Sequence, residues 1–141
     1  MFSRTSTQTI KALVELAKLP TGVCQGAKVI AREINAPANY LGKLLQGLSL
    51  KGLVVSQKGF HGGFRLGKDP QDITLLEVVS SVESVNRLSE CAFGLGQCEG
   101  FSLCPIHSRL ESIRKSYLEF LMNTTIKDLI DQNNHKKMMR V

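Results

Sequence analysis

The stretch LVVSQKGFHGGFRLGK, residues 53–68, decides the fold that the sequence predicts. Residues 53–58 alternate as a short strand does, and residues 64–68 are suited to return beside them as a second strand. Between the two runs, Gly59, Gly62 and Gly63 permit the backbone conformations that a tight turn requires. The sequence therefore predicts a two-stranded hairpin with a glycine-rich, basic tip.

Three short helices are predicted before the hairpin, at residues 7–19, 27–34 and 38–51. Pro20 to Gly22 end the first helix, and Pro37, which cannot continue the second, can open the third. Helices joined by a tight turn and followed by a hairpin are typical of a winged helix-turn-helix, so we expect a mainly α fold with a small β-wing. Apolar residues at helical spacing are expected to face the core; they are Ile10, Leu13, Val14, Ala17, Val29, Ile30, Ile34, Leu41, Leu44, Leu45 and Leu48.

Further helices are predicted after the hairpin. A capping box of Thr74 and Glu77 opens a helix that runs to about residue 85. Pro105 opens the longest helical pattern of the chain, and Thr125 with Asp128 caps a last short helix. The long helix carries an apolar stripe made of Ile106, Leu110, Ile113, Tyr117 and either Phe120 or Leu121.

These patterns divide the chain into four parts. Residues 1–85 form a winged helix-turn-helix DNA-binding domain, residues 86–104 a cysteine-rich loop, residues 105–132 a dimerisation helix with a short helix after it, and residues 133–141 a flexible tail. An apolar stripe on a long helix needs a partner surface, and the same helix in a second copy is the simplest one. Because two-fold dimers read operators with two-fold symmetry, we expect a homodimer on palindromic double-stranded DNA.

Positive charge is concentrated in the first half of the chain. Residues 1–70 hold ten Lys or Arg against three acids, whereas residues 71–141 hold eight against nine. Such a basic region is either a footprint for a polyanion or a solvated surface. If it binds DNA, the third helix presents polar side chains to base edges in the major groove, and the wing reaches phosphates or the minor groove. The predicted DNA contacts are Asn39, Tyr40, Lys43, Lys58, His61 and Arg65.

Three of the four cysteines and one histidine lie between Cys91 and His107, with Cys98 and Cys104 between them. Closely spaced soft ligands separated by glycines suit a chain that wraps around a metal or a cluster. If Pro105 is the first helical residue, Cys104 is the N-cap and His107 lies in the first turn. The positive end of the helix dipole then favours a thiolate at Cys104. The remaining cysteine, Cys24, is predicted to be a small buried residue rather than a ligand.

Three kinds of centre suit these ligands. An iron–sulfur cluster is the first expectation, most simply 2Fe–2S, although three cysteines with a weak fourth ligand can also hold 4Fe–4S. Structural zinc accepts the same three thiolates and imidazole, but zinc sites usually carry closer pairs such as Cys-x2-Cys. The third alternative is a thiol redox switch that holds no metal.

Other functional classes find little support. The chain has no P-loop, no GxGxxG, no Cys-x2-Cys and no nucleophile with a base beside it, so we expect no enzyme. It also lacks an apolar run long enough to span a membrane and the pattern of a secretory signal, so a cytoplasmic protein without membrane contact is expected. Since cytoplasmic thiols are kept reduced, metal or redox chemistry explains the cysteines better than disulfides do.

Residues 1–132 resemble the Rrf2 family of bacterial winged-helix regulators. The resemblance lies in Val29 to Ile34, Pro37 to Leu41, the Gly-Gly wing and the spacing Cys-x6-Cys-x5-Cys-x2-His. It implies a homodimeric transcription factor that senses iron, iron–sulfur supply, nitric oxide or redox state through a cluster. The cysteine loop would lie beside the dimerisation helix, so that cluster state adjusts how the two DNA-reading heads are held.

The resemblance also implies the ligands. Cys91, Cys98 and Cys104 fall on the family's three cluster cysteines, and His107 falls on the histidine that completes the two-iron cluster in IscR-like members. NsrR-like members instead use an acidic residue near the N-terminus of the other subunit, and residues 6–10 here contain no carboxylate. The chain departs from IscR-like members in a first cysteine gap of six residues instead of five, and in Gly42, where they carry an acid.

Overall fold

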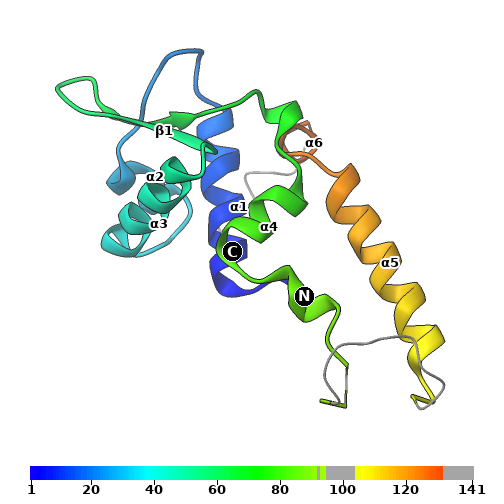
Figure 1. The fold of residues 1–141 in the computed structure, drawn as a ribbon. Coiled ribbons are helices and arrows are strands. Elements are labelled where there is room, and N and C mark those ends of the chain that lie inside the picture. The colour runs from blue at the N-terminus through cyan, green and yellow to red at the C-terminus, as the bar shows by residue number, and fades with distance from the viewer. Residues whose placement is uncertain (92, 95–103, 132–141) are drawn as a thin grey trace.

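The computed structural model describes residues 1–91, 93–94 and 104–131. The helices are α1 (Arg4–Ala17), α2 (Ala27–Glu33), α3 (Ala38–Leu50), α4 (Leu75–Val82), α5 (His107–Asn123) and α6 (Ile126–Ile130), with 3-10 turns η1 (Pro70–Asp72) and η2 (Val85–Leu88). Strands β1 (Val54–Gln57) and β2 (Gly63–Leu66) form the wing. Figure 1 shows a compact head made by α1–α4, the wing and α6, with α5 extending away along one side. The predicted mainly α fold with a small β-wing is confirmed.

The core of the head is made by the inward faces of α1, α2, α3 and α4. Helix α1 begins after Ser3, whose side chain accepts a hydrogen bond from the Ser6 amide at 3.0 Å. In α3, Leu41, Leu45 and Leu48 are buried, because spacings of three and four residues bring them to one side of the helix. Together with Leu13 of α1 and other apolar side chains they form one continuous core.

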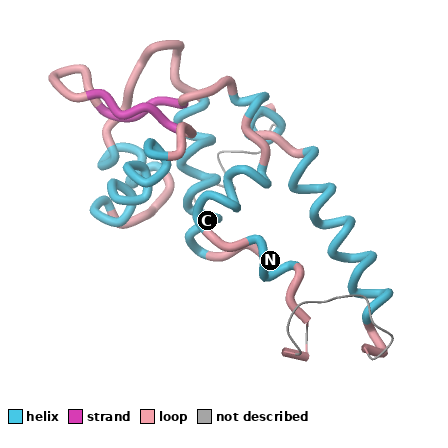
Figure 2. Tube along the Cα trace, viewed as in Figure 1, coloured by secondary structure: helices cyan, strands magenta, loops and turns pink. Residues whose placement is uncertain are grey.

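The wing is tied to the rest of the head by its second strand. Its two strands, magenta in Figure 2, pair antiparallel, and the register places Val54 opposite Leu66 and Gln57 opposite Gly63. On the other side, the Gln25 amide donates to the Phe64 carbonyl at 2.9 Å and the Phe64 amide to the Gln25 carbonyl at 2.8 Å. Gly63 has φ +134°, and a Cβ there would lie 2.6 Å from the Gln25 oxygen. Only glycine therefore allows this close approach.

Helix α6 brings the chain back to the head. Thr125 and Asp128 form the predicted capping box, and hydrogen bonds from Thr125 hold the pKa of the Asp128 carboxyl below its usual range. The Ile126 amide donates to the Ile73 carbonyl at 2.9 Å, and the Ile126 side chain is fully buried. The short helix after α5 is therefore part of the core of the head.

Several predicted helix details are wrong. The long helix begins at His107 and not at Pro105, with Ile106 as its N-cap. The Thr74–Glu77 capping box is one-sided: the Glu77 amide donates to Thr74 Oγ1 at 3.2 Å, but the Glu77 carboxylate pairs with Lys68. The predicted core residue Val29 is 39% exposed, because the buried positions of α2 are Ile30 and Ala31.

Candidate nucleic-acid interface and ligand segment

Helix α3 presents a polar side to solvent. Asn39, Lys43 and Gln46 are exposed on the side opposite the buried leucines, as predicted. Tyr40 is 38% exposed, and its hydroxyl donates to Thr5 Oγ1 at 3.1 Å. Tyr40 therefore links α3 to α1, while Asn39 and Lys43 are available to a ligand that approaches this side.

The wing tip holds two of the predicted contacts and one residue that sequence reasoning missed. Lys58 and His61 are exposed. Between them, Phe60 is 98% exposed, and its ring packs edge to face against His61 with centroids 5.0 Å apart. An aromatic residue inside a glycine-rich turn is visible in the sequence, and its position alone could have drawn attention to Phe60.

Arg65 lies apart from the wing tip. It pairs with Val55 in the middle of the hairpin, and its half-buried side chain lines an open hollow of about 650 Å³ beside the loop after α1. Lys68 and Lys127 line the same hollow, together with Asp69 and Asp131. The structure thus groups Lys58 with His61 at the tip and places Arg65 at the base of the wing.

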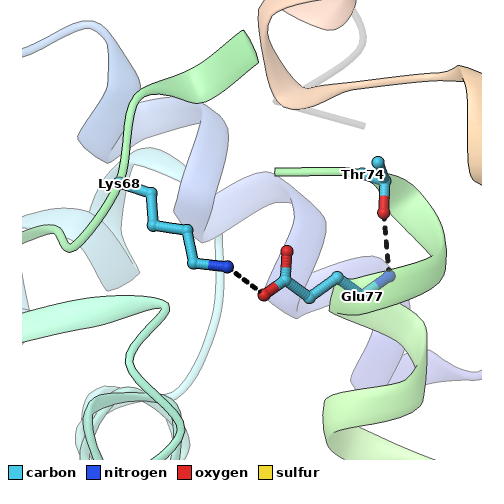
Figure 3. A network of polar contacts seen from close by, with 3 residues as sticks. All are labelled: Lys68, Thr74 and Glu77. Atoms are coloured by element: carbon cyan, nitrogen blue, oxygen red, sulfur yellow. Dashed lines mark hydrogen bonds and ion pairs between the residues drawn. The ribbon is translucent and has the colours of Figure 1, made fainter. Parts of the chain in front are cut away.

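Two of the basic residues between Glu33 and Asp69 hold the head together. Lys68 forms an ion pair with the Glu77 carboxylate, which joins the end of the wing to the first turn of α4 (Figure 3). Lys51, at the end of α3, donates to the Ser81 carbonyl at the end of α4. By contrast, no ion pair within the described residues involves Lys43 or Lys58. Lys43 on α3 and Lys58 near the wing tip are therefore exposed positive charges that a polyanion could contact.

Helix α5 begins at the end of the molecule away from the wing (Figure 1), and two of the predicted metal ligands, Cys104 and His107, lie at its start. His107 is the first residue of α5, and its amide donates to the Cys104 carbonyl at 3.1 Å. Cys104 is therefore not the helix N-cap, because a turn from Cys104 to His107 separates it from the helix. On the other side of the loop, Arg114 of α5 donates to the Glu90 carbonyl, so the residue before Cys91 lies against α5.

The thiols and the imidazole are chemically suitable ligands for a metal centre. In the described part of the chain, however, they are not grouped closely enough to form one. Cys91, Cys104 and His107 are all half-buried, and thiolate and imidazole are ligands for both iron–sulfur clusters and zinc. Cys98 lies outside the described residues. Among residues 1–91, 93–94 and 104–131, no three His, Cys, Asp or Glu side chains are close enough to hold a metal ion.

The fourth cysteine, Cys24, is in the head. It is half-buried in the loop before α2, and its thiol donates to Gln57 Oε1 of β1 at 3.5 Å. The sequence predicted a buried residue there, and the structure gives a partly exposed one. It lies on a different part of the molecule from the segment that contains Cys91 and Cys104.

The apolar stripe of α5 is divided between two surfaces. Leu121 is fully buried against the head, and Tyr117 is half-buried with its ring 6.4 Å from that of Phe2. Burial and the nearby Glu83 carboxylate raise the pKa of the Tyr117 hydroxyl. Ile113, by contrast, is 65% exposed, and Ile106 and Phe120 are also exposed. One side of α5 is thus attached to the head, and another is apolar and uncovered in a single chain.

One polar contact joins the start of the chain to the end of α4. The buried Ser6 hydroxyl of α1 donates to Glu83 Oε1 at 2.6 Å. Glu83 follows α4 directly and lies beside a small cavity of about 260 Å³ that Phe2 and Tyr117 also line. This junction therefore brings α1, α4 and α5 together.

A helix pair whose second member exposes a polar side, followed by a hairpin with a basic tip, defines a winged-helix DNA-binding regulator. The chain belongs to the Rrf2 family, described as iron-dependent transcriptional regulators, whose match covers residues 2–132. The resemblance seen in the sequence is confirmed.

Individual relatives agree with the family. A helix-turn-helix transcriptional regulator of Aquifex aeolicus is 33% identical over 124 residues, which cover 85% of this chain and 86% of that protein. CymR, the global cysteine regulator of B. subtilis, is 28% identical with a TM-score of 0.76, over 92% of this chain and 95% of its own. IscR of T. potens is 25% identical with a TM-score of 0.74, over 92% and 85%. These relatives are transcriptional regulators and not enzymes.

None of the helices in the described part of the chain is both long enough and apolar enough to cross a membrane.

Proposed function

We propose that this chain is a cytoplasmic, homodimeric transcriptional regulator that reads a palindromic operator with α3 and the wing and responds to a metal centre at the start of α5. The observation that carries the DNA-binding part is the exposed side of α3, where Asn39 and Lys43 face solvent with no ion pair to Lys43 among the described residues. Side chains of this kind on a second helix contact base edges and phosphates in the major groove.

The homodimer is supported by the spacing along α5. Ile106, Leu110, Ile113, Tyr117 and Phe120 follow one another at intervals of four and three residues, which is the repeat of a helix that packs along a second helix. Three of them are exposed in the single chain. Two α5 helices packed along this stripe would hold two heads in a two-fold arrangement, which suits a palindromic operator.

The DNA assignment is tested by comparing two lysines that differ only in position. Operators are first selected from random duplexes with the wild-type protein, and affinities are then measured by fluorescence anisotropy at several salt concentrations. Lys43→Ala is expected to weaken binding about tenfold and to reduce the slope of log K against log salt by about one. Lys115→Ala, on an exposed position of α5 outside the apolar stripe, removes the same charge and should leave both values unchanged. Equal binding by Lys43→Ala and wild type would refute the role of α3.

The metal centre is proposed to use Cys91, Cys98, Cys104 and His107, with a 2Fe–2S cluster as the first candidate. The description of the family as iron-dependent supports iron. Three thiolates and an imidazole are a recognised donor set for such clusters, and when bound the cluster would supply one-electron redox chemistry. A 4Fe–4S cluster or zinc would use the same donors.

Similarity to a global cysteine regulator supports a second candidate, in which the same cysteines act as a thiol switch without metal. Anaerobic native mass spectrometry with visible absorption separates the candidates. We expect iron and acid-labile sulfide in equal amounts, lost in Cys98→Ala and retained in Cys24→Ala, whose thiol lies in the head. Colourless protein with one zinc per subunit, or with no metal at all, would overturn the cluster.

A further inference from the structure

The turn at the wing tip is fixed by glycines. The Gly62 amide donates to the Gly59 carbonyl at 3.0 Å, which places Phe60 and His61 at the two central positions of a four-residue turn. Gly59 has φ +104°, and a Cβ on Gly62 would lie 2.3 Å from the Gln57 carbonyl oxygen. The conformation of the turn is therefore restricted, and the side chains of Phe60 and His61 project from the end of the hairpin.

Phe60 is an isolated apolar side chain in a basic surrounding. Among the large hydrophobic residues that the structure describes, only Met1 at the chain start is more exposed. Its neighbours in the turn are Lys58, two glycines and His61, whose ring meets the Phe60 ring at 86°. A protein-binding hot spot is normally surrounded by a ring of other contacts that exclude water, and this tip offers none. A flat aromatic ring beside Lys58 and His61 instead suits a nucleic acid, which offers apolar base faces between phosphates.

We propose that Phe60 is an apolar wedge, which enters the minor groove beside the α3 site and partly unstacks one base step. Lys58 and His61 would contact the phosphates on either side of that step. Because wedge insertion requires unstacking, the step should be a flexible pyrimidine–purine step such as TA or CA, at a fixed distance from the bases that α3 contacts. Phe60 would then contribute operator preference at a position where no side chain reads a base edge.

This inference rests on the proposed DNA-binding function, so its test uses the operator selected with wild-type protein. The test duplexes carry either TA or the stiffer AA at the wing position, with 2-aminopurine as the adenine of that step. Wild type is expected to bind the TA duplex about tenfold more tightly and to increase the 2-aminopurine fluorescence on binding. Phe60→Ala should bind both duplexes equally and leave the fluorescence unchanged. Phe60→Leu keeps an apolar wedge and should retain the preference.

The outcomes separate the wedge from the function on which it rests. If Lys43→Ala loses binding while Phe60→Ala keeps the TA preference and the fluorescence increase, the wedge is wrong and the DNA-binding function stands. Loss of affinity in Phe60→Ala without a fluorescence increase in wild type also overturns the wedge, because the ring would then contact DNA without unstacking it. If both variants bind like wild type, the proposed DNA interface itself fails. Because Phe60 is exposed, equal thermal unfolding of Phe60→Ala and wild type serves as the folding control.

Discussion

The head and helix α5 are held in place in different ways. In the head, apolar side chains of α1, α2, α3, α4, the wing and α6 bury one another in a single core. In α5, all of which the structure describes, Leu121 is the one buried residue, although the helix is 17 residues long and carries several large apolar side chains. The head therefore has the core of an independent folding unit. Helix α5 with its N-cap, by contrast, exposes Ile106, Ile113 and Phe120 in the single chain.

Polar contacts show the same difference. Lys51 and Lys68 connect the ends of α3 and the wing to α4, so two cations of the head have partners within the head. The segment that leads into α5 contacts that helix through the hydrogen bond from Arg114 to the Glu90 carbonyl, and it contains the cysteines that we propose as metal ligands. A module that binds DNA must keep its shape, whereas a module that reports a signal must be able to change. We infer that this division separates binding from sensing.

The largest effect is expected from a cavity in the core of the head. Leu45 of α3 is fully buried, so Leu45→Ala should lower the free energy of unfolding by about 2–5 kcal/mol. Urea unfolding at fixed protein concentration, followed by circular dichroism, measures this value. Ile113→Ala on the exposed side of α5 is the matched control, and it should change the unfolding of dissociated protein by less than about 0.5 kcal/mol. A comparable loss in both variants would show that α5 is built into the head.

A charge on the uncovered side of α5 should act on association instead of folding. Ile113→Glu is expected to weaken self-association about 100-fold, equivalent to about 2.7 kcal/mol, because an ionised carboxylate would be buried without a partner in the dimer. Light scattering over a range of concentrations measures the dissociation constant. Glu119→Gln, exposed and outside the apolar stripe, should leave it unchanged. A dimer that tolerates Ile113→Glu must use another surface.

The fold of the head follows closely from the sequence, because its signals are local. Leu41, Leu45 and Leu48 were assigned correctly, since a spacing of three and four residues fixes one side of a helix. The turn between the strands was equally clear from its glycines. Val29 was assigned wrongly to the core, because in a helix of two turns the apolar positions outnumber those that the neighbouring helices cover.

The candidate site was harder to predict, because it depends on which side chains have partners. A charge count cannot distinguish Lys43, which is exposed, from Lys68, which is paired with Glu77 of a later helix. Strand alternation predicts that Arg65 and Phe64 point to opposite faces of the hairpin. It does not predict the hollow that Arg65 lines, because segments distant in the sequence form that hollow. Pro105 suits the first position of a helix and the second position of a turn equally well. The turn is present, so Cys104 is not an N-cap.

A smaller effect is expected where α1 meets the end of α4, beside α5. Ser6→Ala removes the donor to Glu83 and leaves a partly buried carboxylate without that hydrogen bond, so it should destabilise the chain by about 1–2 kcal/mol. Ser80→Ala is the control, because Ser80 is exposed on α4 and its hydroxyl donates to the Leu76 carbonyl of the same helix at 2.6 Å instead of to another element. If the two variants unfold alike, the Ser6–Glu83 contact does not stabilise the chain.

The smallest effect concerns α3, the helix that we propose to contact DNA. Gly47 lies inside the helix, and nothing lies within 4 Å of the position that a Cβ would take. Gly47→Ala should therefore stabilise the head by about 0.5–1 kcal/mol, because alanine loses less conformational freedom in a helix than glycine does. Gly67→Ala is the opposing control, since a Cβ there would lie 2.4 Å from the Gly52 carbonyl oxygen and must destabilise. If Gly47→Ala raises the melting temperature but weakens operator binding, α3 requires close approach to DNA at residue 47. If Gly47→Ala raises both the melting temperature and the affinity for the operator, glycine at this position is required neither for the fold nor for the contact with DNA.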